Sequence, residues 1–288
     1  MITASLVKEL RAKTNAGMMD CKRALQETEG DIDAAIKLLR EKGIAKAAKK
    51  ADRVANEGVI DARIDSAGKS GIMLEINCET DFVAKNDNFK NFVNELADTL
   101  AGGTATDIDE ALAAKLGDGI VDDAVKAKVI EIGENLQFRR FIRFTVEGEG
   151  VVGSYIHMGG KVGVLLEVGC EKPETVESET FKTMVRDITL HIAAANPQGV
   201  SRDDIPTDVV DAEKDIFRAQ MAESGKPPEI IEKIILGKIG KFFSESCLLE
   251  QGFVKDPDTT IQKLLDTVGK DLGDTLAVRR FARYAVGE

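Results

Sequence analysis

The chain has 288 residues, 43% of them apolar and 31% charged, which is typical of a globular protein with room for two domains. Its net charge of −11 argues against sequence-independent binding of nucleic acid, and the lack of Trp with only 5% aromatic residues argues against base-stacking platforms. No apolar run approaches the roughly 20 residues of a membrane span, and the N-terminus lacks the apolar segment of a signal peptide, so we expect a cytoplasmic protein without membrane contact.

The first 43 residues carry the pattern of three short helices. Gly17 and Gly30 interrupt the helical pattern, and Asp31 is a suitable cap for the third helix. The apolar residues of that third segment recur with the i, i+3, i+4, i+7 spacing of one helix face: Ile32, Ala35, Ile36 and Leu39. The pattern predicts a small helical head at the start of the chain.

A stretch rich in Ala and Lys, residues 44–56, follows this head. Four basic residues of the stretch fall on one helical face: Lys46, Lys49, Lys50 and Arg53. On an otherwise acidic protein, this basic stripe is either a solvated linker helix or a contact for an acidic partner surface. We expect residues 1–54 to form an N-terminal three-helix domain with a basic linker.

The middle of the chain contains an internal repeat. Residues 57–79 align with residues 149–171 at a constant offset of 92 without a gap, and 11 of the 23 pairs are identical. Each copy has the pattern of a strand, a glycine-containing turn, a second strand, a loop and a helix. This pattern predicts an α+β fold with two duplicated subdomains, each built on an antiparallel sheet.

The connection between strand and helix in the first copy, residues 77–86, carries a large aromatic residue, Phe82, and we call it the Phe82 loop. Loops lie on the surface and concentrate function, so Phe82 is either a contact for a partner or a side chain folded back into the core. In the second copy, Glu174 occupies the position of Phe82. Because a shared core position would keep an apolar residue, the repeat favours the surface contact.

A second internal similarity, at an offset of 140, relates residues 133–144 to residues 273–284. Each segment is expected to form a strand, and the later one to supply the matching strand elsewhere in the sheet system. Residues 201–225 have the pattern of an inserted helical hairpin or short coiled coil. The expected organisation after the head is a first core subdomain (55–148), a second core subdomain (149–200 and 226–262), the inserted hairpin (201–225) and a C-terminal module (263–288).

The sequence offers little for catalysis. The four cysteines are far apart, no Gly-x-x-x-x-Gly-Lys loop is present, and the acidic clusters lack the spacing of an EF-hand. We therefore expect no enzymatic activity, no catalytic residue, no metal site and no cofactor. Two alternatives remain open, a hydrolase that uses Asp81 and His157, and an adaptor whose helical head binds peptides on a structural core.

Six short stretches together are typical of one protein family. They are Gly17-Met18-Met19-Asp20-Cys21-Lys22 in the head, residues 77–86, Ile132-Gly133-Glu134-Asn135, residues 155–157 with 163–165, and Ser224-Gly225-Lys226-Pro227. With them the chain resembles bacterial translation elongation factor Ts, the family of guanine-nucleotide exchange factors for the GTPase elongation factor Tu. The resemblance implies a ubiquitin-associated-like head, a core of two subdomains, an inserted coiled-coil hairpin and a C-terminal module.

The resemblance also implies a mechanism and a set of contacts. It places Phe82 in a crevice of the GTPase near the nucleotide's magnesium ion, with Asp81 beside it and Thr80 and Val83 shaping the loop, so that magnesium is displaced and GDP leaves for GTP. Further implied contacts with elongation factor Tu are Lys22, Lys50, Ile132, Gly133, His157 and Val254. It implies no direct contact with nucleic acid and leaves open a homodimer or a 2:2 complex.

Overall fold

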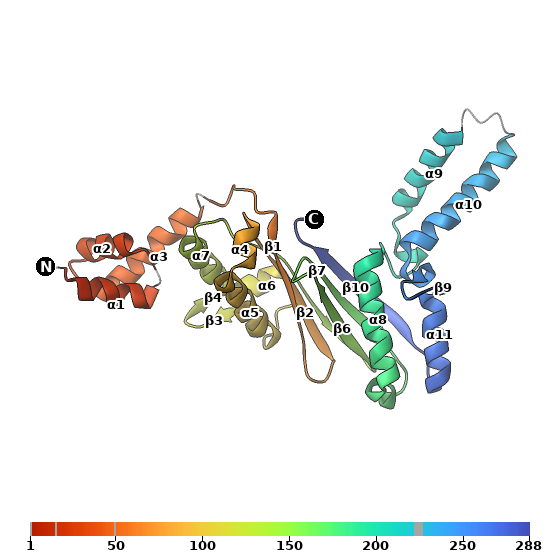
Figure 1. The fold of residues 1–288 in the computed structure, drawn as a ribbon, viewed down its shortest axis with the longest axis horizontal. Coiled ribbons are helices and arrows are strands. Elements are labelled where there is room, and N and C mark those ends of the chain that lie inside the picture. Colours follow the sequence, from red (N-terminus) through yellow and green to blue (C-terminus); the bar gives the residue numbers. More distant parts are fainter. Residues whose placement is uncertain (1, 15, 49, 222–226) are drawn as a thin grey trace.

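The computed structural model describes residues 2–14, 16–48, 50–221 and 227–288, with the side chains of residues 44–48 outside the described set. Figure 1 shows an elongated molecule with a helical head at one end, two sheets in the middle and a helical hairpin that projects at the other end. The α+β class and the small N-terminal helical region predicted above are confirmed.

The head consists of α1 (Ala4–Thr14), α2 (Met18–Glu27) and α3 (Ile32–Ala48). Their apolar faces meet in a small core, and Asp31 caps α3 by accepting a hydrogen bond from the Ala34 N–H at 3.0 Å. α3 continues into the Ala- and Lys-rich stretch as a helix. The side chains of Lys46 and Lys49 lie outside the described residues, so the proposed basic stripe remains an expectation.

The first subdomain comprises a three-stranded antiparallel sheet and the helices that cover it. Its strand order is β1-β2-β5, and α5 buries Phe89, Val93 and Leu96 against the sheet. The elements are β1 (Glu57–Ile64), β2 (Ser70–Cys78), α4 (Asp81–Lys85), α5 (Asp87–Ala101), α6 (Ile108–Ala113), β3 (Lys115–Leu116), β4 (Gly119–Ile120), α7 (Val121–Ile132) and β5 (Gln137–Thr145).

The second subdomain repeats this plan with the strand order β10-β7-β6. The segments related by the offset of 140 form strands, as expected, and these are β5 and β10. Each pairs with the second strand of its own repeat copy. The elements are β6 (Gly150–His157), β7 (Val162–Gly169), η1 (Pro173–Glu177), α8 (Glu179–Ala195), η2 (Arg202–Asp204), α9 (Thr207–Met221), α10 (Pro228–Ser246), η3 (Leu248–Glu250), β8 (Gly252–Phe253), β9 (Asp256–Thr260), α11 (Ile261–Leu272) and β10 (Ala277–Ala285).

Two expected boundaries differ from the structure. The second arm of the hairpin is α10, which lies C-terminal to the expected range 201–225 and pairs with α9 (Figure 1). Residues 224–226 of the sequence motif lie outside the described residues. Residues 263–288 are not a separate module, because α11 and β10 pack into the core of the second subdomain with α8.

The two subdomains pack against each other with approximate twofold symmetry. The Ile60 N–H donates to the Gly160 carbonyl at 2.8 Å, and its counterpart Val152 donates to the Gly68 carbonyl at 2.7 Å. Position 160 requires glycine, since its φ is +97° and an added Cβ would lie 2.7 Å from Val59. The closeness of these backbones fixes the two sheets relative to each other.

Buried ion pairs follow the same symmetry. Glu75 and Glu167, which are 0% and 3% exposed, accept hydrogen bonds at 2.7 Å from Arg140 and Arg280, respectively. Each guanidinium also reaches a backbone carbonyl of the opposite subdomain, Ala285 at 2.9 Å for Arg140 and Thr145 at 3.1 Å for Arg280. These arginines therefore link the two sheets and neutralise the buried glutamates.

Candidate functional site

The tip of the Phe82 loop is the short helix α4. Thr80 precedes the helix in an extended conformation, and its hydroxyl accepts a hydrogen bond from the Val83 N–H at 3.3 Å. Asp81 lies in the first turn, where a negative charge suits the N-terminus of a helix, and pairs with Lys85 at 2.7 Å. The hydrogen bond from Lys85 lowers the pKa of the Asp81 carboxyl.

Phe82 points away from the protein core, as the repeat comparison predicts. Its side chain is 82% exposed, whereas Ala84 is buried and Val83 packs partly against the core of the first subdomain. The single turn of α4 thus holds the Phe82 ring in solvent, while Val83 and Ala84 pack against the core of the first subdomain.

The base of α4 is fixed by a residue that is distant in sequence. The Glu134 carboxylate accepts hydrogen bonds from the Glu79 N–H at 3.1 Å, the Thr80 N–H at 3.0 Å and the Thr80 hydroxyl at 2.7 Å. In return, the Asn135 N–H donates to the Glu79 carboxylate at 2.6 Å. We call the three hydrogen bonds to Glu134 the Glu134 clamp.

Cys78, at the end of β2, completes this support. The thiol is buried and donates to the Thr80 carbonyl at 3.2 Å. Burial, followed by the nearby Glu134 charge, raises the pKa of the Cys78 thiol to about 12. The group therefore stays protonated and serves as a structural contact rather than as a nucleophile.

Several further predicted contacts lie next to this loop. Ile132 ends α7, and Gly133 caps that helix in the left-handed conformation with φ +90°. The Lys50 ammonium donates to the Gly133 carbonyl, and the Asn135 side chain donates to the Arg53 carbonyl at 2.8 Å. The structure thus brings Lys50, Ile132 and Gly133 to the base of the Phe82 loop.

The other predicted contacts lie on separate elements. Lys22 is exposed on α2 in the head, where Met18 and Met19 are also exposed. His157 is exposed at the end of β6 and is hydrogen bonded to the Tyr155 hydroxyl at 3.0 Å. Val254, between β8 and β9, is 40% exposed. Figure 1 places α2 and β9 near opposite ends of the molecule, so these residues do not form one compact site.

Sequence reasoning missed Glu134 and Asn135 as supports of the loop, although both belong to a motif noted above. The available signal was the offset of 140, which pairs Glu134 with Asp274. In the second copy, Asp274 accepts hydrogen bonds from the Glu171 N–H at 3.0 Å and the Lys172 N–H at 3.1 Å. An acidic residue at both positions therefore indicates the same structural role, which is to accept hydrogen bonds from the backbone of the equivalent loop.

The geometry gives no support to the hydrolase alternative. Asp81 is paired with Lys85 on α4, and His157 is paired with Tyr155 in the other subdomain. Among the described residues, no group of three or more His, Cys, Asp or Glu side chains could hold a metal ion. Within the same residues, no helix is long and apolar enough to cross a membrane.

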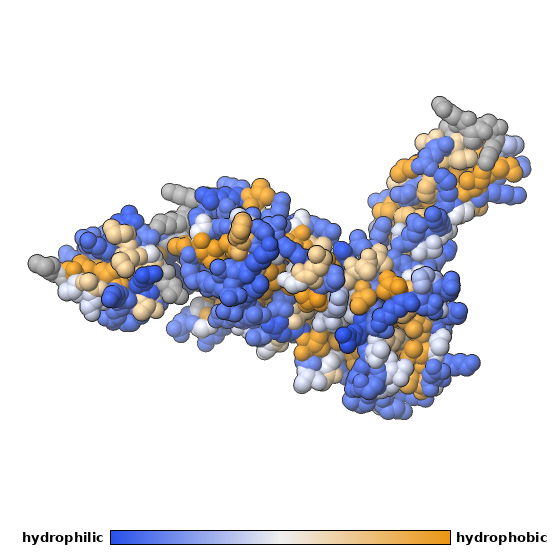
Figure 2. Space-filling view, viewed as in Figure 1, coloured by the Kyte–Doolittle hydropathy of each residue, from blue (hydrophilic) through white to orange (hydrophobic). Residues whose placement is uncertain are grey.

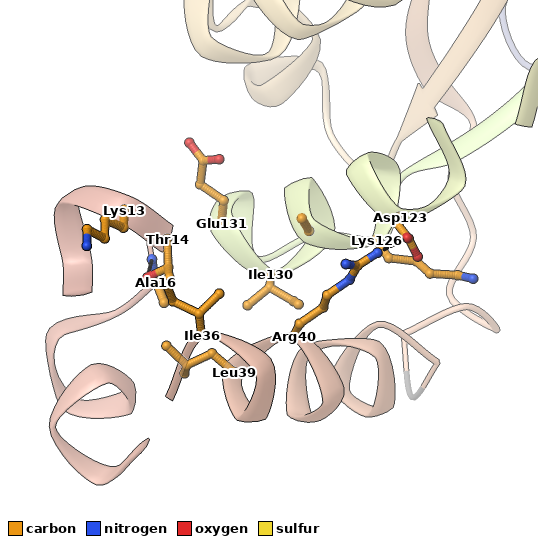
Figure 3. A pocket seen from close by; sticks show the side chains of 11 residues that line it. Lys13, Thr14, Ala16, Ile36, Leu39, Arg40, Asp123, Lys126, Ile130 and Glu131 are labelled. Atoms are coloured by element: carbon orange, nitrogen blue, oxygen red, sulfur yellow. Dashed lines mark hydrogen bonds and ion pairs between the residues drawn. The ribbon is translucent and has the colours of Figure 1, made fainter. Parts of the chain in front are cut away.

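A cavity also lies between the head and the first subdomain, and both apolar and charged side chains line it. It has a volume of about 210 Å³ and lies between α3 and α7, with Ile36, Leu39 and Ile130 on its walls (Figure 3). Arg40 and Asp123 form an ion pair at its edge. The arrangement is that of a helix packing interface between the head and the first subdomain.

Comparison with known proteins identifies the family. A family profile described as "Elongation factor TS" matches residues 79–288. The chain is 47% identical to elongation factor Ts of Trichlorobacter lovleyi and 46% identical to that of Nitratiruptor sp., in each case over 100% of this chain and 93% of the relative. It is 48% identical to elongation factor Ts of Bdellovibrio bacteriovorus over 99% of this chain and 92% of the relative. The chain therefore belongs to the elongation factor Ts family of translation elongation factors.

Proposed function

We propose that the protein is a guanine-nucleotide exchange factor. It binds the GDP-bound GTPase elongation factor Tu, displaces the magnesium ion held beside the nucleotide, and promotes release of GDP so that GTP can bind. The observation that carries this proposal is the 82% exposed Phe82 on a helix that is fixed at its base. A large apolar side chain held rigidly in solvent is typical of a contact that becomes buried in a complex.

The proposed action of Phe82 is that of a wedge. Its ring enters an apolar crevice of the GTPase, Asp81 lies beside it, and Thr80 and Val83 set the shape of the loop. Displacing the groups that hold the water shell of the magnesium ion removes the bridge between the ion and the β-phosphate of GDP. Exchange of this kind requires no chemical step, so we propose no catalytic residue and no enzymatic activity for this chain.

Binding energy from other parts of the chain is also required. A thousandfold acceleration of GDP release corresponds to about 4 kcal/mol of barrier lowering, whereas burying one Phe side chain contributes roughly 1.5–3 kcal/mol. We propose Lys22, Lys50, Ile132, Gly133, His157 and Val254 as the further contacts. By reciprocity, bound GDP or GTP must weaken the affinity of the exchange factor for the GTPase.

The test is the release of fluorescent GDP from elongation factor Tu in stopped-flow mixing. Replacing Phe82→Ala is expected to slow release roughly tenfold to a hundredfold, since it removes about 1.5–3 kcal/mol of contact energy. Glu174→Ala, at the equivalent position of the second copy, is the matched control and should release GDP at the wild-type rate. A Phe82→Ala rate within twofold of the wild type would contradict the wedge.

A further inference from the structure

We propose that Glu134 is a positioning residue for nucleotide exchange, because its carboxylate holds α4 and thereby sets the direction of Phe82. This inference rests on the function proposed for Phe82. We assign Glu134 no contact of its own with the GTPase. It acts through the loop that it clamps.

The clamp is connected to the cap of α4 by a shared hydroxyl group. The Thr80 hydroxyl donates to Glu134 at 2.7 Å and accepts from the Val83 N–H at 3.3 Å. The rotation of this hydroxyl is therefore fixed by a charged acceptor on one side and a helix donor on the other. A change in the carboxylate is transmitted through Thr80 to the first turn of α4, where Phe82 lies.

The backbone that carries Glu134 is itself held on both sides. Gly133 closes α7 with φ +90°, and an added Cβ there would require a strained conformation. Asn135 is 6% exposed, and its side chain donates to the carbonyls of Ala51 at 3.3 Å and Arg53 at 2.8 Å. Glu134 thus links the Phe82 loop to a segment whose backbone is itself held by hydrogen bonds.

The second subdomain supplies an internal comparison. Asp274 also accepts a hydroxyl hydrogen bond, in this case from Thr175 within η1, and the tip residue there is the exposed Glu174. The residue that precedes η1 is Lys172, which makes no side-chain cap. A carboxylate clamp is therefore present in both copies, but only Glu134 is joined to the cap of a helix that carries an aromatic side chain.

Glu134→Gln is the informative substitution. The amide oxygen of Gln can still accept from the Glu79 and Thr80 N–H groups, but the negative charge is lost and the amide N–H group then faces the Thr80 hydroxyl, which must change from donor to acceptor. Displacement of a reacting or binding group by 1 Å can cost up to about a hundredfold in rate. We expect Glu134→Gln to lower the maximal rate of GDP release roughly tenfold, with little change in the concentration of factor that gives half the maximal rate.

The experiment measures GDP release from elongation factor Tu over a range of factor concentrations for full-length wild type, Glu134→Gln and Asp274→Asn. Asp274→Asn weakens the equivalent clamp where no aromatic residue depends on it, and should keep the maximal rate of the wild type. Thermal unfolding of both variants shows whether the loss of stability is similar. A maximal rate that falls equally in both variants, or in neither, would overturn the positioning role.

A double-mutant cycle separates this inference from the function on which it rests. If Glu134 acts through Phe82, Glu134→Gln has no further effect on the release rate in the Phe82→Ala background. Additive effects would overturn the positioning role while leaving the wedge intact. A normal rate for Phe82→Ala alone overturns the proposed function and this inference together. Thr80→Val, which removes the shared hydroxyl but keeps the shape of the side chain, is the second variant and should also lower the maximal rate.

Discussion

Phe82 is exposed at a position where an aromatic ring contributes nothing to the folded core. A helix of five residues is too short to be stable by itself, so its conformation depends on the contacts at its base. Those contacts come from Thr80, from the partly buried Val83, from the buried Ala84, and from Glu134. The exposure of Phe82 was predictable because the second copy has Glu174. The clamp was harder to predict, because Glu134 lies 55 residues after Glu79.

A second residue-scale feature is the buried His191. Its Nε2 is hydrogen bonded to Gln251 Oε1 at 2.9 Å, and its Nδ1 accepts from the Val254 N–H at 3.2 Å, which requires the neutral ring. Burial lowers the pKa of His191 below its usual value of 6.5, although the Gln251 hydrogen bond opposes this shift. His191 therefore supports the segment that carries the proposed contact Val254.

The free energy of unfolding should consequently fall as the pH falls from 7.5 to 5.5. Below a pH of about 6.5 the unfolded chain binds a proton at His191 that the folded protein does not bind, so protonation favours unfolding. Carboxyl groups titrate in unfolded chains near pH 4, outside this range. Urea unfolding at several pH values tests this: His157→Gln should keep the decline and His191→Gln should lose it. A decline that follows His157 instead would show that the assignment is wrong.

At the scale of elements, the two internal repeats were the sequence features that predicted most of the fold. The offset of 140 correctly indicated that β5 and β10 occupy equivalent places in the two sheets. The bounds of the hairpin were predicted less accurately, since its second arm, α10, lies outside the expected range. The apolar residues of α10 have the same periodicity whether they face the core or another helix. Figure 2 shows apolar residues gathered along the projecting hairpin, where Ile216 and Leu236 are exposed.

The paired strands also predict unequal effects of two equivalent arginines. Within the described ion pairs, Arg140 is the charged partner of Glu75, whereas Glu167 has both Arg279 at 3.1 Å and Arg280 at 2.7 Å. Arg140→Met leaves a fully buried carboxylate without a cation and should lower the free energy of unfolding by about 3–5 kcal/mol.

Arg280→Met is the matched control for this substitution. It should cost no more than about 1 kcal/mol, since Arg279 remains beside Glu167 and the Arg280 side chain is 47% exposed. Urea unfolding of the two variants provides the comparison. The dependence of the free energy of unfolding on urea concentration must be equal in the two variants for their stabilities to be compared directly. Equal losses in Arg140→Met and Arg280→Met would contradict this account of the interface.

At the scale of the whole molecule, the proposed contacts extend from α2 in the head to the β8–β9 segment (Figure 1). This spread agrees with the energetic argument that Phe82 alone is insufficient for exchange. The placement of the head was not predictable from local patterns, because it depends on tertiary contacts. Gly43 of α3 approaches Ile130 of α7, and Arg40 pairs with Asp123 across the same interface.

The central claim is that Phe82 accelerates GDP release by displacing magnesium from the GTPase. It is tested most directly by comparing wild type and Phe82→Ala in buffer with magnesium and in buffer with excess EDTA. If magnesium displacement is the step that Phe82 provides, chelation replaces it, and the two proteins should release fluorescent GDP at nearly the same rate in EDTA. A ratio of rates that is as large in EDTA as in magnesium would contradict the claim.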